Sequence, residues 1–362
     1  MGRGAVPASS VDKITLADVA AAAQVSVPTA SKALRGGSDV AAATRSRVES
    51  AMADLGYAPP VRQRRRAGLI DLVFTQLSPW ATEIIRGAEE PALSAGTRLA
   101  VSTASDERQR ERWLDSLASS RTDGVILVLT ELSPYHRARL QDLHVPVVVI
   151  DPIGQPAPSL PSIGASNWAG GITATEHLIE LGHRRIGTIT GRPELLCSRA
   201  RLDGYRAALE RAGVDVESSL IAVGDFHYES ALAAAGQMLE LPEPPTAIFA
   251  ASDVQALGVY EAARQHHLQI PRDLSVVGFD DVEMAQWASP PLTTLRQPLA
   301  EMAALAARTL LEGNAESFNQ RVELATNLVV RQSTAPPHRH AARAQHDAGP
   351  SRGDGLTEEL RS

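Results

Sequence analysis

The stretch Ile14-Thr-Leu-Ala-Asp-Val-Ala20 sets the pattern of the N-terminal region. Its apolar residues recur at helical spacing, and Thr15 followed by Asp18 is typical of a helix N-cap with an acidic first turn. The stretch Val25-Ser-Val-Pro-Thr-Ala-Ser-Lys-Ala-Leu34 predicts a second helix, with a serine cap and a proline in its first turn. A third helix is expected over residues 41–55. Short helices joined in this way, with a tight turn between the first two, are typical of a helix-turn-helix.

C-terminal to this region, short apolar runs of strand length alternate with helical stretches. The expected strands are residues 69–74, 99–102, 124–129, 147–150, 186–190, 247–250 and 274–279. The expected helices between them are residues 81–95, 107–120, 134–143, 168–181, 199–212, 229–239 and 254–267. This alternation is typical of parallel sheets with helices on both faces, and its resumption after Pro161 predicts two α/β lobes. From Ser333 the chain is rich in Pro, His, Arg and Gly and lacks periodicity, which predicts a disordered tail over 333–362.

The charge of the chain is unevenly distributed. The 362 residues carry a formal net charge of −7, which taken alone argues against a nucleic-acid binder. Residues 1–66, however, hold ten Lys or Arg against five Asp or Glu, a net charge of +5, so the remainder carries −12. The acidic total is therefore the average of a basic N-terminal region, suited to DNA, and an acidic remainder.

Cysteine content and hydropathy bear on the cellular location of the protein. Cys197 is the only cysteine, so the chain has no intrachain disulfide framework and no cysteine-rich metal site. The first ten residues lack the apolar run of a secretory signal, and no apolar stretch reaches the roughly 18 residues that span a membrane. We expect a soluble, cytoplasmic protein with no membrane partner.

Enzymes and transport receptors fit the sequence less well than a DNA-binding protein does. A sugar kinase or dehydrogenase would also have α/β lobes, but no Gly-x-Gly-x-x-Gly follows a strand and no Gly-x₄-Gly-Lys-Ser/Thr occurs. No catalytic triad or metal-ligand spacing is visible, so we expect no catalytic residue, cofactor or metal. A ligand-binding transport receptor would need a signal peptide and would have no use for a helix-turn-helix, and a gel shift distinguishes the two.

The N-terminal region resembles the DNA-binding domain of the lactose-repressor (LacI/GalR) family of bacterial regulators. The stretches that carry the resemblance are residues 14–20, 25–34, 44–48 and 55–59. Residues from about Gly68 to Gln332 resemble the core of the same family, which is related to periplasmic sugar-binding proteins. The firmest matches in the core are residues 178–186, 199–205, 252–258, 275–281 and 290–295.

The resemblance implies an all-α helix-turn-helix headpiece followed by an α/β core of two lobes with parallel sheets. In such folds the chain crosses between the lobes three times, which places crossings near Gly164, Arg296 and Glu323. The implied ranges are 1–58 for the DNA-binding domain, 59–67 for the hinge, 68–332 for the core, 68–164 with 297–322 for the N-lobe, and 165–295 with 323–332 for the C-lobe.

The second helix of a helix-turn-helix lies in the major groove and offers its N-terminal side chains to base edges. By position these are Val27, Pro28 and Lys32. Val27 and Pro28 can make only apolar contacts, for example to a thymine methyl. Phosphate contacts, which position the protein without reading sequence, are expected from Ser26, Thr29, Ser31, Tyr57, Arg35, Arg45 and Arg47. Thr15 and Ser26 are first of all helix caps, although a cap can also present a helix N-terminus to phosphate.

The linker departs from the family pattern. The family's hinge helix reads roughly Asn-x-x-Ala-Arg-x-Leu, and its leucine wedges between base pairs in the minor groove. Here the string is Pro60-Val-Arg-Gln-Arg-Arg-Arg66, with arginine in the leucine place and Gln63 in the alanine place. An arginine in a narrow minor groove can substitute for the wedge, so we expect weaker DNA bending than the family norm. The arginines expected to contact DNA are Arg62, Arg64, Arg65 and Arg66.

A second departure lies in the turn of the helix-turn-helix. The family usually has a glycine there, and this chain has Gln24. Glutamine can serve at this position if the backbone is not strictly left-handed.

Polar and aromatic residues follow the ends of the expected strands, where open parallel sheets bind ligands. The candidate polar contacts for sugar hydroxyls are Asp151, Asn167, Arg199, Arg201, Asp253 and Asp280. The candidate aromatic walls for the C–H face of a sugar are Trp80, Trp168 and Trp287. The family resemblance points most firmly to Asp280 and Arg201. Structural alternatives are a helix N-cap for Asp253, lobe packing for Trp287, and a bystander role for Cys197.

The resulting hypothesis is a homodimeric regulator, a repressor of carbohydrate-utilisation genes, that binds a palindromic operator through two recognition helices. A sugar would close the lobes, disorder the hinge and lower the affinity for DNA, whereas a corepressor would act with the opposite sign. The stretches Asn167-Trp-Ala-Gly-Gly171 and Leu196-Cys-Ser-Arg-Ala-Arg201 look like regulators of pentose or plant-oligosaccharide use. They suggest xylose or a xylo-oligosaccharide as the effector.

Overall fold

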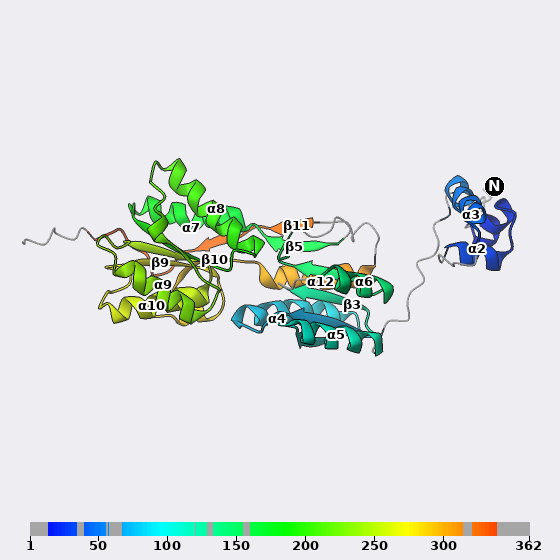
Figure 1. The fold of residues 1–362 in the computed structure, drawn as a ribbon, viewed down its shortest axis with the longest axis horizontal. Coiled ribbons are helices and arrows are strands. Elements are labelled where there is room, and N and C mark those ends of the chain that lie inside the picture. Colours follow the sequence, from blue (N-terminus) through cyan, green and yellow to red (C-terminus); the bar gives the residue numbers. More distant parts are fainter. Residues whose placement is uncertain are drawn as a thin grey trace, which may run out of the picture. The chain divides into compact units, whose positions relative to one another are not determined.

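The chain forms two compact units, Met1–Arg66 and Ala67–Ser362 (Figure 1). The structure is a computed structural model that describes residues 14–34, 40–55, 57, 67–119, 121–128, 133–154, 160–313 and 321–338. In these ranges no helix is both long enough and apolar enough to cross a membrane.

The N-terminal unit is a bundle of short helices around a core of small side chains. Its described helices are α1 (Leu16–Ala22), α2 (Val27–Leu34) and α3 (Ala42–Leu55). Its buried apolar residues are Val19, Ala20, Ala23, Ala30, Ala33, Val48 and Ala51. Because most of these are alanines, the helices approach closely, and α1 and α2 form the predicted helix-turn-helix.

The turn between α1 and α2 is fixed by helix caps and by one residue with a positive φ. The backbone N–H and the hydroxyl of Thr15 both donate to Asp18 Oδ2, at 2.7 Å each. Ser26 Oγ accepts from the backbone N–H of Thr29 at 3.2 Å. Gln24 has a φ of +54°, so the position is left-handed. The condition under which glutamine replaces glycine without strain is therefore not met, and its Cβ costs about 1 kcal/mol there.

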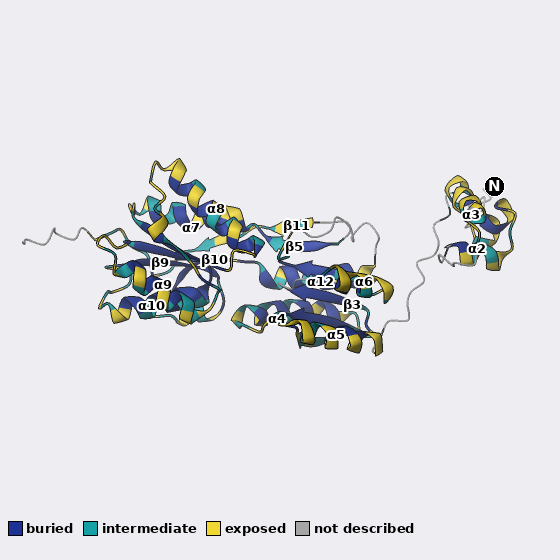
Figure 2. Ribbon diagram, in the orientation of Figure 1, coloured by how far each residue is buried: buried dark blue, intermediate teal, exposed yellow. Residues whose placement is uncertain are grey.

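The first lobe of the second unit, the N-lobe, is a parallel sheet with helices on both faces (Figures 1 and 2). Its strands are β1 (Leu69–Phe74), β2 (Arg98–Thr103), β3 (Gly124–Val128), β4 (Val147–Ile150), β5 (Ser162–Ala165) and β11 (Arg321–Leu324), in the order β11-β5-β4-β3-β1-β2. Its helices are α4 (Pro79–Ser94), α5 (Glu107–Ser119), α6 (Pro134–Asp142) and α12 (Leu299–Glu312). Leu72 packs with α4 and α12, whereas Val73 packs with α5 and α6, as the two-residue period of a strand requires.

The second lobe, the C-lobe, repeats this plan. Its strands are β6 (Ile186–Thr190), β7 (Ile221–Val223), β8 (Ala247–Ala250), β9 (Ser275–Asp280), β10 (Thr293–Arg296) and β12 (Asn327–Val329), in the order β12-β10-β9-β8-β6-β7. Its helices are α7 (Asn167–Glu180), α8 (Leu196–Arg211), α9 (Tyr228–Leu239), α10 (Asp253–Gln265) and the short α11 (Met284–Trp287), with a 3₁₀ turn at Ser218–Leu220. Helices α7 and α8 cover one face and α9 and α10 the other. Strand β12 is antiparallel to β10, which makes this sheet mixed.

Within the described residues the chain crosses between the lobes three times. The crossings lie between Ala165 and Asn167, between Arg296 and Leu299, and between Leu324 and Asn327. Two of them are bonded together: the N–H of Ser166 donates to Leu324 O at 2.8 Å, and the N–H of Thr326 donates to Ser166 Oγ at 3.1 Å. The predicted fold class, with two α/β lobes and three crossovers, is confirmed.

Most of the elements that the sequence does not predict are short. Strands β5, β7, β10, β11 and β12 and helix α11 have three or four residues each, too few to show a period. Helix α12, with 14 residues, is also not predicted. The predicted start of the disordered tail is wrong, because Ser333 is fully buried. Its hydroxyl accepts from the N–H of Thr293 at 2.8 Å and donates to Val276 O at 2.6 Å. The described chain continues to His338, and residues 339–362 lie outside it.

Helices α7 and α8 pack through two glycines, and this packing fixes the position of Arg201. A Cβ on Gly171 would lie 2.3 Å from the carbonyl oxygen of Arg201, and one on Gly204 would lie 2.3 Å from that of Trp168. No side chain fits at either position without moving a helix backbone. The close approach therefore holds the start of α8, and with it Arg201, against α7.

Candidate binding sites

The carboxyl ends of strands from both lobes meet around a cavity of about 90 Å³. The N-lobe contributes residues from the loop after β1 and from the ends of β3 and β4, and the C-lobe contributes residues after β6, β7, β8 and β9. The lining residues used below are Phe74, Trp80, Asp151, Arg192, Cys197, Arg201, Asp225, Phe226, Asp280 and Gln297. A cleft at this place in parallel α/β sheets is the usual ligand site.

Arg201 is the fixed cation of the cavity. Its guanidinium is buried, donating from Nε to Asn167 Oδ1 at 2.8 Å and from Nη1 to the carbonyl oxygen of Ala251 at 2.5 Å. It also lies 3.7 Å from the centre of the Phe279 ring, which supplies a cation–π contact. Hydrogen bonds in the guanidinium plane and an aromatic ring on its face leave the group one orientation.

Two buried carboxyls lie near Arg201. Arg201 Nη1 is 3.9 Å from Asp280 Oδ1, which also accepts from Gln297 Nε2 at 2.6 Å. Burial raises the pKa of Asp280 to about 7, although Arg201 acts to lower it. Burial likewise raises the pKa of Asp151 to about 6, again opposed by Arg201. One guanidinium therefore does not offset the loss of water around both acids.

The backbone that presents these acids is strained. Asp151 has a φ of +47°, Asp280 of +122° and Phe226 of +71°, and each follows or ends a strand at the cavity. Residues with a Cβ seldom adopt these angles, and such strain concentrates at functional sites.

Gln297 completes the polar wall and leaves an acceptor without a partner. Its Nε2 is used by Asp280, whereas its Oε1 is buried and accepts no hydrogen bond from the described residues. Leaving a buried carbonyl oxygen without a hydrogen-bond donor costs about 1–3 kcal/mol of stability. A ligand hydroxyl that donates to it would provide that partner.

The structure brings together part of the predicted effector set. Trp80, Asp151, Arg201 and Asp280 line the cavity, and Asn167 lies behind it as the partner of Arg201. Arg199 points elsewhere, with Nη1 donating to Pro193 O at 3.4 Å.

Asp253 does not face the cavity. It is buried, with Oδ2 accepting from the N–H of Val282 at 2.9 Å and Oδ1 accepting from the hydroxyl of Thr294 at 2.5 Å. The cap of α10 is Ser252, whose Oγ accepts from the N–H of Gln255 at 3.2 Å. Asp253 therefore ties α10 to the β9 and β10 ends, and the structure does not support it as an effector contact.

The aromatic walls also differ from the expectation. Trp168 is 52% exposed and Trp287 is 70% exposed, and neither lines the cavity. Phe74 and Phe226 lie there with Trp80 instead. Phe226 was missed because β7, the strand that precedes it, is too short to be read from periodicity.

Four further lining residues carry no signal in the sequence pattern. Arg192, Asp225 and Gln297 stand in irregular segments whose neighbours across the cavity come from distant parts of the chain. Cys197, expected to be a bystander, lines the cavity as well. Burial raises the pKa of its thiol to about 11, which keeps it protonated at neutral pH.

The N-terminal unit presents a second candidate surface at the start of α2. Val27 is 44% exposed, and Pro28 and Lys32 are exposed. The hydroxyls of Ser26 and Thr29 bond to each other at 2.8 Å, so the first turn offers a mainly apolar surface. Thr15 is occupied by Asp18, Ser31 is half-buried, and Tyr57 packs against the helix core. Of the other predicted phosphate contacts, Arg47 is exposed and Arg45 is half-buried on α3. The predicted contacts Arg35, Arg62, Arg64, Arg65 and Arg66 lie outside the described residues.

Comparisons with known proteins match both parts of the chain. The family model described as bacterial regulatory proteins, lacI family, matches residues 15–60, and the periplasmic binding protein-like domain matches residues 175–334. The repressor CytR of Escherichia coli (strain K12) is 36% identical over 304 residues, 82% of this chain and 89% of that protein. The ribose operon repressor of the same organism is 35% identical over 88% of this chain and 99% of its own length.

A solved structure extends the likeness to the whole fold. The transcriptional regulator CelR in complex with cellobiose is 34% identical, with a TM-score of 0.68, over 88% of this chain and 99% of that chain. The chain therefore belongs to the lacI family of bacterial regulatory proteins. It is a DNA-binding transcriptional regulator, and its relatives are regulators rather than enzymes.

Asp280→Asn should raise the melting temperature of the ligand-free chain at pH 8. Asparagine can still accept from Gln297, and it removes a carboxyl whose pKa burial has raised. Because the folded pKa is about 7 and the ordinary value is 3.8, the stability contributed by this group is fully present below 3.8 and lost as pH rises through 7. The difference in melting temperature between the variant and wild type should be largest at pH 8, at about 2–4 °C per kcal/mol of stability. It should vanish toward pH 4.

Calorimetry across pH 4–8 checks this, with the exposed Asp215→Asn as a surface control. An advantage that is the same at every pH, or a variant less stable than wild type at pH 8, would contradict burial as the cause.

Proposed function

We propose that the chain represses genes for the uptake or use of a sugar and that this sugar, bound between the lobes, releases it from its operator. The observation that carries the proposal is the polar wall of the cavity, where Asp151, Asp280 and the unpaired Oε1 of Gln297 face the fixed guanidinium of Arg201. Asp151, Asp280 and Gln297 each offer acceptor oxygens on this wall. A ligand rich in hydroxyl donors is the natural complement.

The apolar part of the cavity fits the other side of a sugar. Trp80 and Phe226 supply flat surfaces for a C–H face, and the polar residues take the hydroxyls at the ring edge. Among the relatives, one is a ribose operon repressor and another was solved in complex with cellobiose. Carbohydrate is therefore the ligand class that both the chemistry and the family favour.

The size of the cavity favours a monosaccharide. Its volume is about 90 Å³, and a water takes up about 30 Å³ in the liquid, so the cavity has room for only a few waters. A cavity of this size suits a small ligand such as one sugar ring better than two linked rings. Of the effectors that the sequence suggests, we favour xylose over a xylo-oligosaccharide.

A thermal-shift screen of pentoses, hexoses, xylobiose and cellobiose tests the proposal. At 100 times its Kd, the effector should stabilise the chain by about 2.7 kcal/mol, or about 5–11 °C for domains of this size. Asp280→Asn should lose most of the shift and Asp215→Asn should keep it. A panel without any shift would sink the sugar proposal, and larger shifts from disaccharides than from monosaccharides would sink the size argument.

DNA release follows from linkage between the two sites. A ligand that binds better to the DNA-free form must weaken DNA binding by the same factor by which DNA weakens ligand binding. We propose that two copies of the chain in the cytoplasm bind a two-fold symmetric operator, each with α2 in a major groove. A promoter gel shift with and without the sugar gives the sign, and tighter binding with sugar would make the ligand a corepressor.

On the DNA side, we propose that Val27 and Pro28 read thymine. They stand exposed and adjacent in the first turn of α2, while the hydroxyls of Ser26 and Thr29 bond to each other. The C5-methyl of thymine is the apolar feature of the major groove. Lys32, one turn further on, is exposed and suited to a guanine edge or a phosphate.

Replacing single thymidines by deoxyuridine should identify the base that this surface contacts. Duplexes selected by the full chain from a random library are re-synthesised with one substitution each. Loss of one methyl contact, about 0.8 kcal/mol, should weaken binding about fourfold at one or two adjacent positions per half-site.

In Val27→Ala, deoxyuridine substitution should no longer weaken binding. In the control Ile14→Ala, which changes an exposed apolar residue outside α2, it should weaken binding as in wild type. Indifference to deoxyuridine at every position would refute thymine reading.

A further inference from the structure

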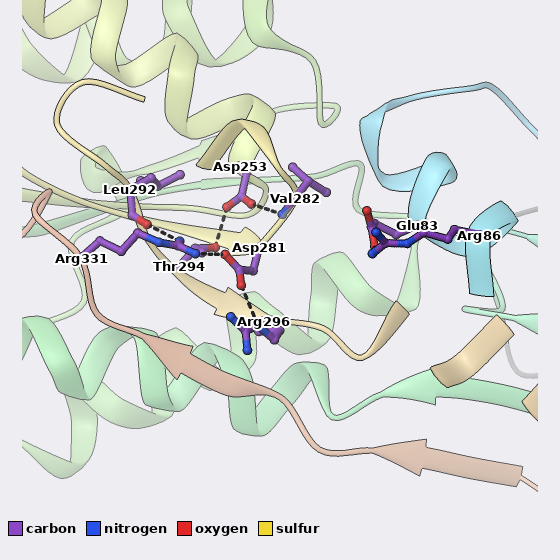
Figure 3. Close-up of polar contacts among 9 residues, drawn as sticks. All are labelled: Glu83, Arg86, Asp253, Asp281, Val282, Leu292, Thr294, Arg296 and Arg331. Carbon is purple, nitrogen blue, oxygen red and sulfur yellow. Dashed lines mark hydrogen bonds and ion pairs between the residues drawn. The ribbon is translucent and has the colours of Figure 1, made fainter. Parts of the chain in front are cut away.

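Two consecutive aspartates at the end of β9 make different contacts. Asp280 and Asp281 both have positive φ, +122° and +60°. Asp280 lines the effector cavity, whereas Asp281 does not line it and lies in an ionic cluster of its own (Figure 3). Both residues also line a second, neighbouring cavity. Two strained residues in succession suggest that both side chains must be held in defined places.

The carboxylate of Asp281 is almost completely buried between two arginines. Arg296 Nε donates to Oδ2 at 2.6 Å, and Arg331 Nη2 donates to Oδ1 at 2.5 Å. Arg331 Nη1 also donates to Leu292 O at 2.8 Å, which fixes that arginine in place (Figure 3). Each carboxylate oxygen thus has its own charge-assisted bond, the strong form of hydrogen bond in proteins.

Both arginines mark segments that pass between the lobes. Arg296 ends β10 and immediately precedes Gln297 in the second crossing. Arg331 follows β12, the strand that the third crossing leads into. Strand β12 pairs with β10, with Asn327 opposite Arg296, so the second and third crossings meet at this edge of the C-lobe. Asp281 therefore joins the residue at which the second crossing begins, Arg296, to the segment that follows β12, at Arg331. The third crossing is in turn bonded to the first through Ser166.

The same crossing carries a ligand-facing pair. Gln297 donates to Asp280 through Nε2 at 2.6 Å, and its backbone N–H donates to Asp280 O at 3.2 Å. The pair Asp280–Gln297 therefore lies one residue along from the pair Asp281–Arg296 on both strands. The two pairs are therefore adjacent along both segments of the chain.

Arg296 is the member of the cluster that has room to move. Its side chain is 57% exposed, whereas that of Arg331 is mostly buried. It lines a second cavity of about 480 Å³, whose N-lobe wall carries Glu83, Arg86 and Glu301. Glu83 and Arg86 form an ion pair on α4, across the space from Arg296 (Figure 3).

We propose that Asp281 is a positioning residue that couples the effector cavity to the lobe crossings through Arg296 and Arg331. The proposal rests on the proposed function, since it assumes an effector between the lobes. In it, the effector acts on Asp280 and Gln297, and the Asp281 cluster converts that contact into a change at the crossings.

The experiment measures ligand affinity and DNA response separately. Wild type and Arg296→Gln are compared in two assays: calorimetric titration with the sugar identified by the thermal-shift screen, and operator binding by full chain with and without saturating sugar. Arg296 is chosen because its exposed side chain can be changed with little risk to folding. We expect the sugar Kd of the variant to stay within about threefold of wild type. The sugar-induced change in operator Kd, typically about 5–150-fold in allosteric proteins, should fall at least fivefold.

Two further variants separate coupling from structure. Arg296→Lys keeps the charge near Asp281 and should restore part of the response. Arg272→Gln removes another arginine–aspartate pair of the C-lobe, in which Arg272 Nη2 lies 2.9 Å from Asp273 Oδ2, and should respond like wild type.

The outcomes are distinguishable. Equal sugar responses in Arg296→Gln and wild type overturn the coupling role, as does a loss of sugar affinity with an intact response at saturation. A wild type that binds no sugar of the panel overturns the proposed function, and this inference with it.

Discussion

The burial of one guanidinium among carboxyls, carbonyls and aromatic rings is the constraint on which the core depends. Arg201 can be buried only because Asn167, Ala251 and Phe279 satisfy it from three directions, and these groups come from α7, β8 and β9. The glycine contact between α7 and α8 sets its backbone. The fixed guanidinium lies near two acids, Asp151 and Asp280, at the carboxyl ends of the strands. It offsets the cost of burying their charge only in part. We propose that these buried acceptors suit the cavity to a ligand with hydroxyl donors.

Strain and polarity then connect this cavity to the rest of the molecule. Asp280 and Asp281, both with positive φ, carry neighbouring carboxyls into different contacts. Asp280 lies at the cavity beside Arg201 and Gln297, and Asp281 lies between Arg296 and Arg331. Both Asp280 and Asp281 lower the folding stability, because each carboxyl is buried and each backbone has a positive φ. The N-terminal unit is built in the contrary manner, from small apolar contacts and helix caps, with its basic charge left for DNA.

The sequence predicted the fold class and the acids at strand ends, but not which side chains share a cavity. Asp280 and Arg201 were identified because strand ends and family motifs carry local signals. Asp253 stands at a similar strand end, yet it accepts hydrogen bonds from Val282 and Thr294 and does not line the cavity. The positions of β9 and β10, which are distant in sequence, determine these contacts. Phe226 and Gln297 follow short elements without a period, and the exposed Trp168 shows that an aromatic beside a strand end need not face it. Ser333 was assigned to the tail because hydrogen bonding to distant strands leaves no pattern in composition.

The central claim is that ligand hydroxyls supply the donors that Asp151 and Asp280 lack. Donation to a carboxyl favours its ionised form, so binding near pH 6, where the pKa values of about 6 and 7 leave both acids partly protonated, must release protons. Calorimetric titration with the effector sugar in buffers of different ionisation enthalpy measures this number directly. We expect net proton release at pH 6 in the wild type and much less in Asp280→Asn. Binding with no proton exchange, or with proton uptake, would contradict it.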